Sequence, residues 1–355
     1  MTDPRIRLLV VDDSNFVRIA LRKMLEPASD IEIVGEARNG AEALRLSRKL
    51  KPHVVAMDLN MPIMDGIESV QAIAAEKGPP CIMVSNETSE GAAATIRALE
   101  TGAVDFVCKN SSFITFDMAS IERQLTEKVR HWGRWRMALT GEAGGVPAPV
   151  PAVEPSAPPR PAIRGHRPDL IVVGVSTGGP VALAELLGAL GPLPCPLVVA
   201  QHMPASFTAG FAASLARLLG RPVVEGGDGS ALAPGMVTIL RGGSDWTVRR
   251  PSSGRFSLHA AEPAETIYHP SADRLFRSAA EAAESPVAVV LTGMGEDGSL
   301  GAAAFAERRL PVLVQDPATC AVDGMPKAAI RAGVATEVLP VAGIARKLNI
   351  LLTPA

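Results

Sequence analysis

Short runs of β-branched and other apolar residues alternate along this chain with longer stretches of helical periodicity. The short runs include RIRLLVV, HVVAM, PCIMV and DFVC in the first half and PDLIVV, CPLVVA and SPVAVV in the second. Continuous apolar runs of strand length are typical of parallel strands joined by crossover helices. The pattern therefore predicts a parallel α/β architecture in both halves of the chain.

A proline-rich segment separates the two halves. From Thr140 to Pro168 the sequence is TGEAGGVPAPVPAVEPSAPPRPAIRGHRP, in which proline removes backbone donors and few side chains could form a core. At 355 residues, 47% of them hydrophobic, the chain is long enough for two domains with separate cores. We predict one domain over residues 1–139, a linker over 140–167 and a second domain over 168–355.

The composition excludes several classes of protein. The formal net charge of −2 offers no broad basic field for nucleic acid or anionic lipid. Asp12 and Asp13 interrupt the first apolar run too early for a signal peptide, and the other apolar runs are too short to span a membrane. We therefore expect a cytoplasmic protein that neither binds nucleic acid nor inserts into a membrane.

Each of the four apolar runs in the first half ends in polar residues. In chain order these are Asp12 with Asp13, Asp58, Ser85 and Lys109. The carboxyl ends of parallel strands meet at one edge of a sheet, and converging carboxylates repel one another unless a hard cation lies among them. Mg²⁺ prefers such oxygen ligands. The sequence therefore predicts a Mg²⁺ site where Asp58 attacks a phosphorus centre and Lys109 pairs with the transferring group.

Taken singly, these residues also have ordinary structural explanations. Asp13 and Ser14 could cap the helix that follows them, and Lys109 could be a solvated charge at a helix entry. Four groups at four successive strand ends favour the functional interpretation over these alternatives.

The segments VVDDS, MDLNMPIMDG, VSN and GAVDFVCKN resemble the receiver domains of bacterial response regulators, over about residues 6–138. The resemblance implies a flavodoxin-like α/β domain with strand order 2-1-3-4-5 and Asp58 as the phosphoacceptor. The implied Mg²⁺ ligands are Asp12, Asp13, Asp58 and the backbone carbonyl of Asn60. The implied switch residues are Ser85, Phe106 and Lys109. The lysine of this family is usually followed by proline, whereas Asn110 follows it here.

In the second half, PDLIVV is followed by GVSTGGP and VALAELLGAL, which predict a strand, a glycine-rich turn and a helix. Ser176 lies at this turn, where Gly174, Gly178 and Gly179 permit tight or left-handed backbone and the helix N-terminus favours negative charge. Such a turn could also serve chain geometry alone or hold a nucleotide phosphate. The spacings GxGxxG and GK[ST] are both absent, which disfavours the nucleotide.

Two later runs supply partners for the serine. CPLVVA leads to His202, and SPVAVVLTG leads to MGEDGS, which contains Asp297. Side chains at adjacent strand ends can meet within hydrogen-bond distance. His202 would then take the proton of Ser176 as it attacks an acyl carbon, with Asp297 orienting the imidazole. The amide of Met294 and, more weakly, that of Thr177 are candidate oxyanion donors.

These assignments also have alternatives. A histidine at a strand end is often structural, and Asp297 could form a turn with Gly298. The order serine, histidine, aspartate differs from that of ordinary α/β-hydrolases, which argues for another family. His259 has no assigned role, and for His269 we favour a surface or packing role over one at the rim of the site.

The segments GVSTGGP, QHMPASFTAGFAASLA, PSADRLFRSAA, LTGMGEDGSLGA and VQDPATCAVDGMPKAA resemble, in this order, the catalytic domain of chemotaxis protein-glutamate methylesterases of the CheB type, over about residues 168–351. The resemblance implies a doubly wound, mainly parallel α/β domain. By it, Ser176 is the nucleophile, His202 the base and Asp297 its orienting acid, while Met294 contributes to the oxyanion hole.

The same resemblance implies hydrolysis of glutamyl methyl esters on methyl-accepting chemotaxis receptors, often with deamidation of receptor glutamines. It also implies that the receiver covers the active site until a chemotaxis histidine kinase phosphorylates it. Mg²⁺ is expected in the receiver, and no cofactor for ester hydrolysis. Two alternatives are a phosphorylation-dependent adaptor without activity, which the complete set of three residues disfavours, and a transcription factor, which would need a basic helix-turn-helix.

Overall fold

The computed structural model describes two compact units, divided at about Ala152. The described residues are 4–86, 89–109, 118–142, 167–251, 254–262 and 268–353. Within them, no helix combines the length and the apolar composition that a membrane span requires. The proline-rich residues 143–166 and Asn110 lie outside the described residues, so the predicted domain boundaries stay predictions.

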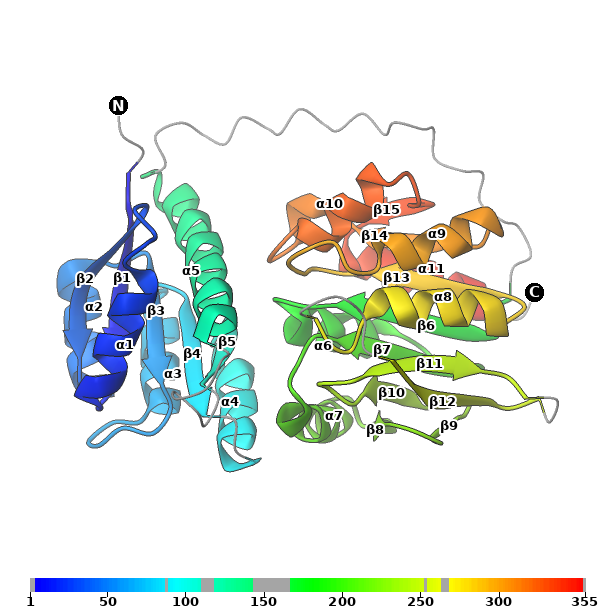
Figure 1. Ribbon diagram of the computed structural model, residues 1–355, viewed down its shortest axis with the longest axis horizontal. Coiled ribbons are helices and arrows are strands. Elements are labelled where there is room, and N and C mark those ends of the chain that lie inside the picture. The colour runs from blue at the N-terminus through cyan, green and yellow to red at the C-terminus, as the bar shows by residue number, and fades with distance from the viewer. Residues whose placement is uncertain are drawn as a thin grey trace. The chain divides into compact units, whose positions relative to one another are not determined.

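The first unit is built on a five-stranded parallel sheet with the order β2-β1-β3-β4-β5 (Figure 1). Its strands are β1 (Ile6–Val11), β2 (Ile31–Ala37), β3 (Val54–Asp58), β4 (Cys81–Asn86) and β5 (Asp105–Lys109). Its helices are α1 (Asn15–Leu25), α2 (Gly40–Leu50), α3 (Gly66–Ala75), α4 (Ser89–Thr101) and α5 (Met118–Thr140). The predicted strand order and the flavodoxin-like α/β class are confirmed.

Capping side chains begin three of these helices. Ser14 caps α1, Asn39 caps α2, and Asp65 forms a capping box with Glu68 at the start of α3. The capping role considered as an alternative for Ser14 is therefore confirmed. It places the start of α1 directly after the acidic pair that follows β1.

Helix α5 and the two residues after it belong to the packing of the first unit. Glu142 pairs with Arg7 at 3.3 Å, and its carboxylate lies 3.1 Å from Nε2 of His53. His53 is buried, and its other ring nitrogen accepts from the Arg7 amide at 3.0 Å. Glu142 is therefore packed against the first unit through Arg7 and His53.

The second unit contains a seven-stranded parallel sheet with the order β15-β14-β13-β6-β7-β10-β8 (Figure 1). Its strands are β6 (Leu170–Val175), β7 (Leu197–Gln201), β8 (Val223–Gly226), β10 (Val237–Leu240), β13 (Pro286–Val290), β14 (Val312–Gln315) and β15 (Glu337–Leu339). Its helices are α6 (Gly179–Ala189), α7 (Ala205–Leu219), α8 (Ala272–Ala282), α9 (Ser299–Glu307), the 3₁₀ helix η1 (Pro317–Thr319), α10 (Gly324–Arg331) and α11 (Val341–Leu352). The predicted mainly parallel α/β class is confirmed.

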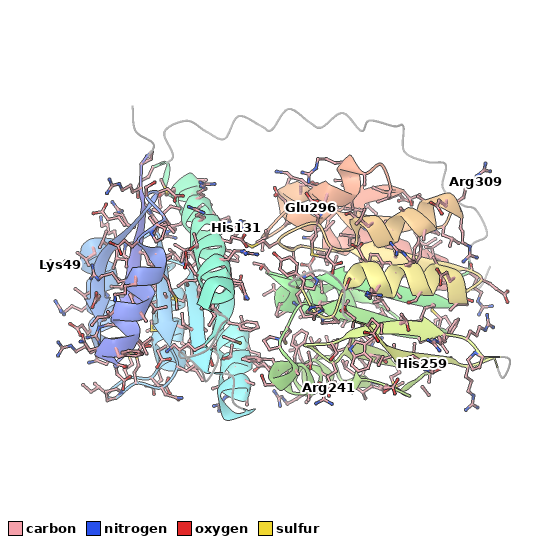
Figure 2. The ribbon with its side chains drawn as sticks, in the orientation of Figure 1. Lys49, His131, Arg241, His259, Glu296 and Arg309 are labelled. Carbon is pink, nitrogen blue, oxygen red and sulfur yellow. The ribbon has the colours of Figure 1, made fainter. Side chains whose placement is uncertain are left out.

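A three-stranded antiparallel sheet, which the sequence analysis did not predict, accompanies the large sheet. It has the order β11-β12-β9, with strands β9 (Ala231–Leu232), β11 (Asp245–Arg249) and β12 (Phe256–Ala261). His259, labelled in Figure 2, lies on β12, and its Nε2 is 3.1 Å from the hydroxyl of Ser257. His259 therefore has a local partner on its own strand.

Strand β6 marks the point where the winding of the large sheet reverses. The chain continues from β6 to β7 and then to β8 and β10 on one side, and later adds β13, β14 and β15 on the other. Gly174 on β6 is in register with both Ala200 on β7 and Val290 on β13. The loops that follow these three adjacent strands therefore meet at a switch point, where α/β proteins commonly bind ligands.

Close packing brings α8 to this edge of the sheet. A Cβ at Gly174 would lie 2.8 Å from Cβ of Ala272 and 3.1 Å from the ring of Phe276. Phe276 in turn meets Phe305 of α9 edge to face, with centroids 6.1 Å apart. The lack of a side chain at Gly174 therefore lets the first turn of α8 approach β6.

Candidate active site and acidic pocket

The predicted acidic pocket is present at the carboxyl edge of the five-stranded sheet. Carboxylate oxygens of Asp12, Asp13 and Asp58 lie within 4.8 Å of one another. Nζ of Lys109 donates to Asp12 at 2.6 Å and to Asp58 at 2.7 Å. Asp12 and Lys109 are buried, and Asp13 is exposed. The structure therefore brings these four predicted residues together.

The electrostatics of the pocket suit a bound cation. Burial raises the pKa of Asp58, the ammonium group of Lys109 opposes that rise, and the charge of Asp12 adds to it. A divalent cation among the carboxylates would offset the repulsion between them, and oxygen donors are those that Mg²⁺ prefers. The residues present therefore fit Mg²⁺.

The other predicted receiver residues surround this pocket. Asn60 lies in an exposed position in the loop after Asp58. Ser85 is buried near the end of β4, and its hydroxyl donates to the carbonyl of Gly91 at 3.4 Å. Phe106 is buried on β5. The metal-ligand role of Asn60 and the switch roles of Ser85 and Phe106 stay predictions.

Ser176 lies at the turn between β6 and α6. Its amide donates to the carbonyl of Thr292 at 3.0 Å, and its own carbonyl accepts from Nε2 of Gln201 at 3.0 Å. Gly178 adopts the left-handed region with φ of 76°, which favours glycine. Gly179 instead accommodates a close neighbour, because a Cβ there would lie 2.1 Å from Oε1 of Gln201. The predicted strand-to-helix turn is present, with Gly178 in its left-handed position.

His202 follows β7 directly and is hydrogen-bonded to Asp297. Its Nε2 lies 2.8 Å from Oδ2 of Asp297, and both side chains are buried. Nδ1 of His202 is also buried and has no hydrogen-bond partner among the described residues. The His202 amide donates to Val175, the residue before Ser176, at 3.0 Å. The structure thus forms the predicted imidazole–carboxylate pair beside the serine turn.

Asp297 is held by four donors, two on each oxygen. Oδ2 accepts from His202 and from the amide of Ala272 at 2.6 Å. Oδ1 accepts from the hydroxyl of Ser271 at 3.1 Å and from the amide of Asp273 at 2.9 Å. Burial raises the pKa of Asp297, but the bonds from His202 and the two amides outweigh it and hold this pKa below its usual range. Asp297 is therefore a carboxylate seated on the N-terminus of α8.

Asp273 lies against the same carboxylate, and its pKa shifts in the opposite direction. Burial and the negative charge of Asp297 raise the pKa of Asp273 to about 6, although the amides of Gly301 and Gly298 stabilise its charged form. The Gly301 bond is 2.6 Å long. The pKa values of the two acids at the α8 N-terminus therefore shift in opposite directions, downward for Asp297 and upward for Asp273.

The two predicted oxyanion donors lie in turns beside Ser176. Met294 is half-buried between Gly293 and Gly295 in the turn after β13. Thr177 is buried, and its carbonyl accepts from the hydroxyl of Thr292 at 3.0 Å. The oxyanion roles of Met294 and Thr177 stay predictions.

Sequence reasoning missed several residues that hold this site in place. Gln201 joins the two turns, because its Nε2 donates to the carbonyls of both Ser176 and His202. Thr292 accepts from the Ser176 amide, and Ser271 donates to Asp297. A serine before an amphipathic run is a recognisable helix-start signal, but no sequence pattern pairs Ser271 with an acid on another loop.

The segment before α8 also contacts the site. The ring of Tyr268 stacks on that of His202, with centroids 4.8 Å apart and planes 12° from parallel. Nδ1 of His269 lies 3.0 Å from Oδ1 of the buried Asp245, which also accepts from the Ser271 amide at 2.7 Å. His269 therefore packs within this segment.

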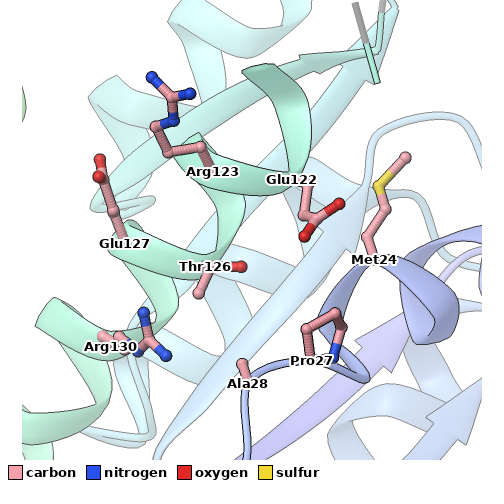
Figure 3. A pocket seen from close by; sticks show the side chains of 8 residues that line it. All are labelled: Met24, Pro27, Ala28, Glu122, Arg123, Thr126, Glu127 and Arg130. Atoms are coloured by element: carbon pink, nitrogen blue, oxygen red, sulfur yellow. The ribbon is translucent and has the colours of Figure 1, made fainter. Parts of the chain in front are cut away.

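A separate groove of 390 Å³ lies on the first unit between the end of α1 and α5 (Figure 3). It is lined by Met24, Pro27, Ala28, Glu122, Arg123, Thr126, Glu127 and Arg130. Arg130 already pairs with Asp30 at 2.8 Å. Because α1 starts at the carboxyl edge of the sheet and ends at the opposite one, this groove is not part of the acidic pocket.

Family models match both units of the chain. The response regulator receiver domain matches residues 8–117, and the CheB methylesterase matches residues 171–348. Among solved structures, the crystal structure of the Thermotoga maritima CheB methylesterase catalytic domain is 35% identical. It covers 52% of this chain and 98% of that one, with a TM-score of 0.50.

Full-length relatives give the same result. A protein named protein-glutamate methylesterase/protein-glutamine glutaminase 1 from Oleidesulfovibrio alaskensis is 41% identical over 97% of this chain and 98% of its own length. A protein-glutamate methylesterase/protein-glutamine glutaminase from Nocardioides sp. is 44% identical over 95% of this chain and 93% of its own. The resemblance found in the sequence is therefore confirmed, and the chain belongs to the CheB methylesterase family with an N-terminal response regulator receiver domain.

Proposed function

We propose that this protein is a phosphorylation-regulated serine hydrolase that demethylates glutamyl methyl esters, and deamidates glutamines, on methyl-accepting chemotaxis receptors. The observation that supports it most is the hydrogen bond between the buried side chains of His202 and Asp297, beside the Ser176 turn. The relatives at 41% and 44% identity are named for both activities.

The geometry suggests how the acyl transfer proceeds. Because Nε2 of His202 is bonded to Asp297, Nδ1 is the nitrogen available to take the proton of Ser176 Oγ as that oxygen attacks the ester carbon. The amides of Met294 and Thr177, which belong to the adjoining turns, would donate to the resulting oxyanion. His202 then returns the proton to the leaving methoxide, so that methanol departs.

The second half of the reaction uses the same groups. Water attacks the acyl-enzyme, His202 takes its proton, and Ser176 leaves with that proton as the receptor glutamate is released. With a glutamine substrate the first leaving group is ammonia and the remaining steps are unchanged. Asp297 stays a carboxylate throughout, because the bond from His202 and the two amides at the α8 N-terminus hold its pKa low.

In the receiver, Asp58 accepts a phosphoryl group from a chemotaxis histidine kinase. Mg²⁺ held by Asp12, Asp13, Asp58 and the carbonyl of Asn60 would neutralise charge on that group. Lys109 pairs with the phosphoryl oxygens, and Ser85 with Phe106 responds to them. The phosphorylated receiver then uncovers the active site, and the whole cycle takes place in the cytoplasm, without a cofactor for ester hydrolysis.

Methanol release from methylated receptor preparations, with and without a small phosphodonor, tests this function. We expect Ser176→Ala to lower the rate by about 10⁴-fold or more while Asp58 still accepts phosphate. Ser257→Ala, the same change on β12, is the control and should remain active. Turnover by Ser176→Ala within tenfold of the parent would contradict the assignment, and a parent that binds receptors without releasing methanol would favour the adaptor.

A further inference from the structure

The ring of Tyr268 covers one face of the His202 imidazole. The two rings are nearly parallel, at 12°, and their centroids are 4.8 Å apart. Tyr268 is the single tyrosine of the chain. The His202 side chain is only 6% exposed, so the stacked ring forms part of the wall that separates it from solvent.

The turn that precedes Asp297 is shaped to receive the Tyr268 ring. A Cβ at Gly295 would lie 3.0 Å from Cε2 of Tyr268 and 3.4 Å from its hydroxyl oxygen. Gly295 also has φ of 82°, which disfavours any side chain there. The ring therefore lies between the imidazole and the turn that contains Met294.

A buried carboxylate fixes the backbone that follows Tyr268. Asp245 is fully buried at its side chain and accepts from both His269 and the Ser271 amide. Nε of Arg274 lies 3.7 Å from its other oxygen. The anchored segment leads directly into α8, whose N-terminus holds Asp297. The segment from Tyr268 to Asp273 therefore positions both Asp297, which bonds to His202, and the ring that stacks on His202.

We propose that Tyr268 is a positioning residue for His202, an inference that rests on the proposed hydrolase function. The bond from Nε2 to Asp297 fixes one edge of the imidazole, but a single bond does not fix the tilt of the ring, and Nδ1 has no bond of its own among the described residues. Stacking against Tyr268 fixes that tilt and so keeps Nδ1 aimed for proton transfer. The π face also stabilises the imidazolium that forms during each step.

Replacing the ring separates this role from simple space filling. Tyr268→Leu keeps an apolar cover without a π face, and we expect kcat for methanol release to fall about tenfold with KM little changed. Tyr268→Phe keeps the ring and should retain kcat within about twofold. Phe256→Leu removes a buried ring from β12 of the same domain, where it lies under Arg250, and serves as the control with unchanged kcat.

A spectroscopic measurement tests the contact without relying on activity. Because the chain has one tyrosine, 3-fluorotyrosine places a single ¹⁹F label at position 268 of the full-length protein. We expect its resonance to lie away from that of the unfolded protein and to move when His202→Gln removes the imidazole. A ¹⁹F resonance that does not move in His202→Gln would contradict the stacking of Tyr268 on His202.

The outcomes separate this inference from the hydrolase proposal. If the parent releases methanol but Tyr268→Leu matches its kcat, or Tyr268→Phe is as slow as Tyr268→Leu, the positioning role of the ring is wrong and the hydrolase stands. If the parent releases no methanol while the ¹⁹F resonance responds to His202→Gln, the contact is real and the proposed reaction is wrong.

Discussion

Two buried carboxylates, one in each unit, lie at the carboxyl edge of a parallel sheet and are equally hidden from solvent. Asp58 is 9% exposed and Asp297 is 8% exposed. Their pKa values nevertheless move in opposite directions, upward for Asp58 and downward for Asp297. Burial alone therefore does not decide the charge state of either acid.

The difference comes from the groups that face each acid. Asp58 faces a second carboxylate, Asp12, and shares one ammonium group with it. Asp297 receives four hydrogen bonds, two of them from backbone amides at a helix N-terminus. The surroundings of Asp58 suit an acid that binds a cation and accepts a phosphoryl group. The surroundings of Asp297 suit an acid that must stay ionised to orient an imidazole.

The largest expected effect on kcat comes from replacing the carboxylate of Asp297 with a neutral amide. In Asp297→Asn one oxygen becomes an NH₂ group that faces two donors, so either His202 loses its acceptor or the α8 N-terminus is displaced. We expect kcat for methanol release to fall about 10⁴-fold. Phosphate incorporation at Asp58, measured on the same sample, should not change.

The matched control for Asp297→Asn is Asp169→Asn. Asp169 also accepts two backbone amides, those of Glu284 and Ser285, but it precedes β6 at the opposite end of the strand. Asp169→Asn should keep near-parental kcat. An Asp297→Asn enzyme that is equally active would show that the orienting acid is dispensable.

A smaller effect is expected from the corresponding change in the receiver. Asp58→Asn removes the phosphoacceptor, and we expect phosphate incorporation to fall at least about a hundredfold and the rise in hydrolysis with phosphodonor to disappear. Hydrolysis without phosphodonor should stay within about twofold of the parent. Chelation of Mg²⁺ in the parent should likewise lower phosphate incorporation and abolish the rise in hydrolysis with phosphodonor.

Asp30→Asn is the control within the receiver, because Asp30 lies just before β2 at the other edge of the sheet and pairs with Arg130. It should still accept phosphate. If hydrolysis by Asp58→Asn still responds to phosphodonor, control through Asp58 is wrong.

The smallest expected effect concerns stability and its dependence on pH. The folded-state pKa of Asp273, about 6, lies above its ordinary value of 3.8, so its protonated form stabilises the fold. That contribution is complete below about pH 4 and is lost as pH rises through about 6. Asp273→Asn mimics the protonated acid, and we expect it to raise the free energy of unfolding at pH 7 by about 2–3 kcal/mol at most.

Denaturant unfolding of this variant and the parent at pH 5 and pH 7 measures the effect. The gain should be smaller at pH 5, where the parent acid is largely protonated. A gain that is the same at both pH values, or a loss at pH 7, would contradict the opposite behaviour of the two acids at the α8 N-terminus.

Much of the molecule follows from local sequence patterns. Apolar runs of strand length, each followed by a helical stretch, were sufficient to predict parallel sheets, and the polar residues at their ends identified Asp58, Ser176 and His202. The antiparallel sheet was missed because its strands β11 (DWTVR) and β12 (FSLHAA) alternate apolar and polar residues, whereas the prediction rested on continuous apolar runs.

The supporting residues of the active site were also beyond local patterns. Ser271 and Tyr268 act through residues on other loops, so their spacing along the chain holds no signal of the contact. The contacts of Asp245 also leave no local signal, because its partners His269 and Ser271 lie in a distant part of the sequence.

The sequence by itself determined the two α/β units, the residue types at the strand ends and their order along the chain. Only the tertiary structure decided that β6 lies between β7 and β13, which brings the loops of Ser176, His202 and Asp297 together. It also decided that His202 and the amides at the α8 N-terminus together keep Asp297 ionised, and that Nε2 of His202 bonds to this acid while Nδ1 has no partner among the described residues. Strand order and donor placement arise from long-range packing, and a linear pattern of residues does not record which distant amides will face a given carboxylate.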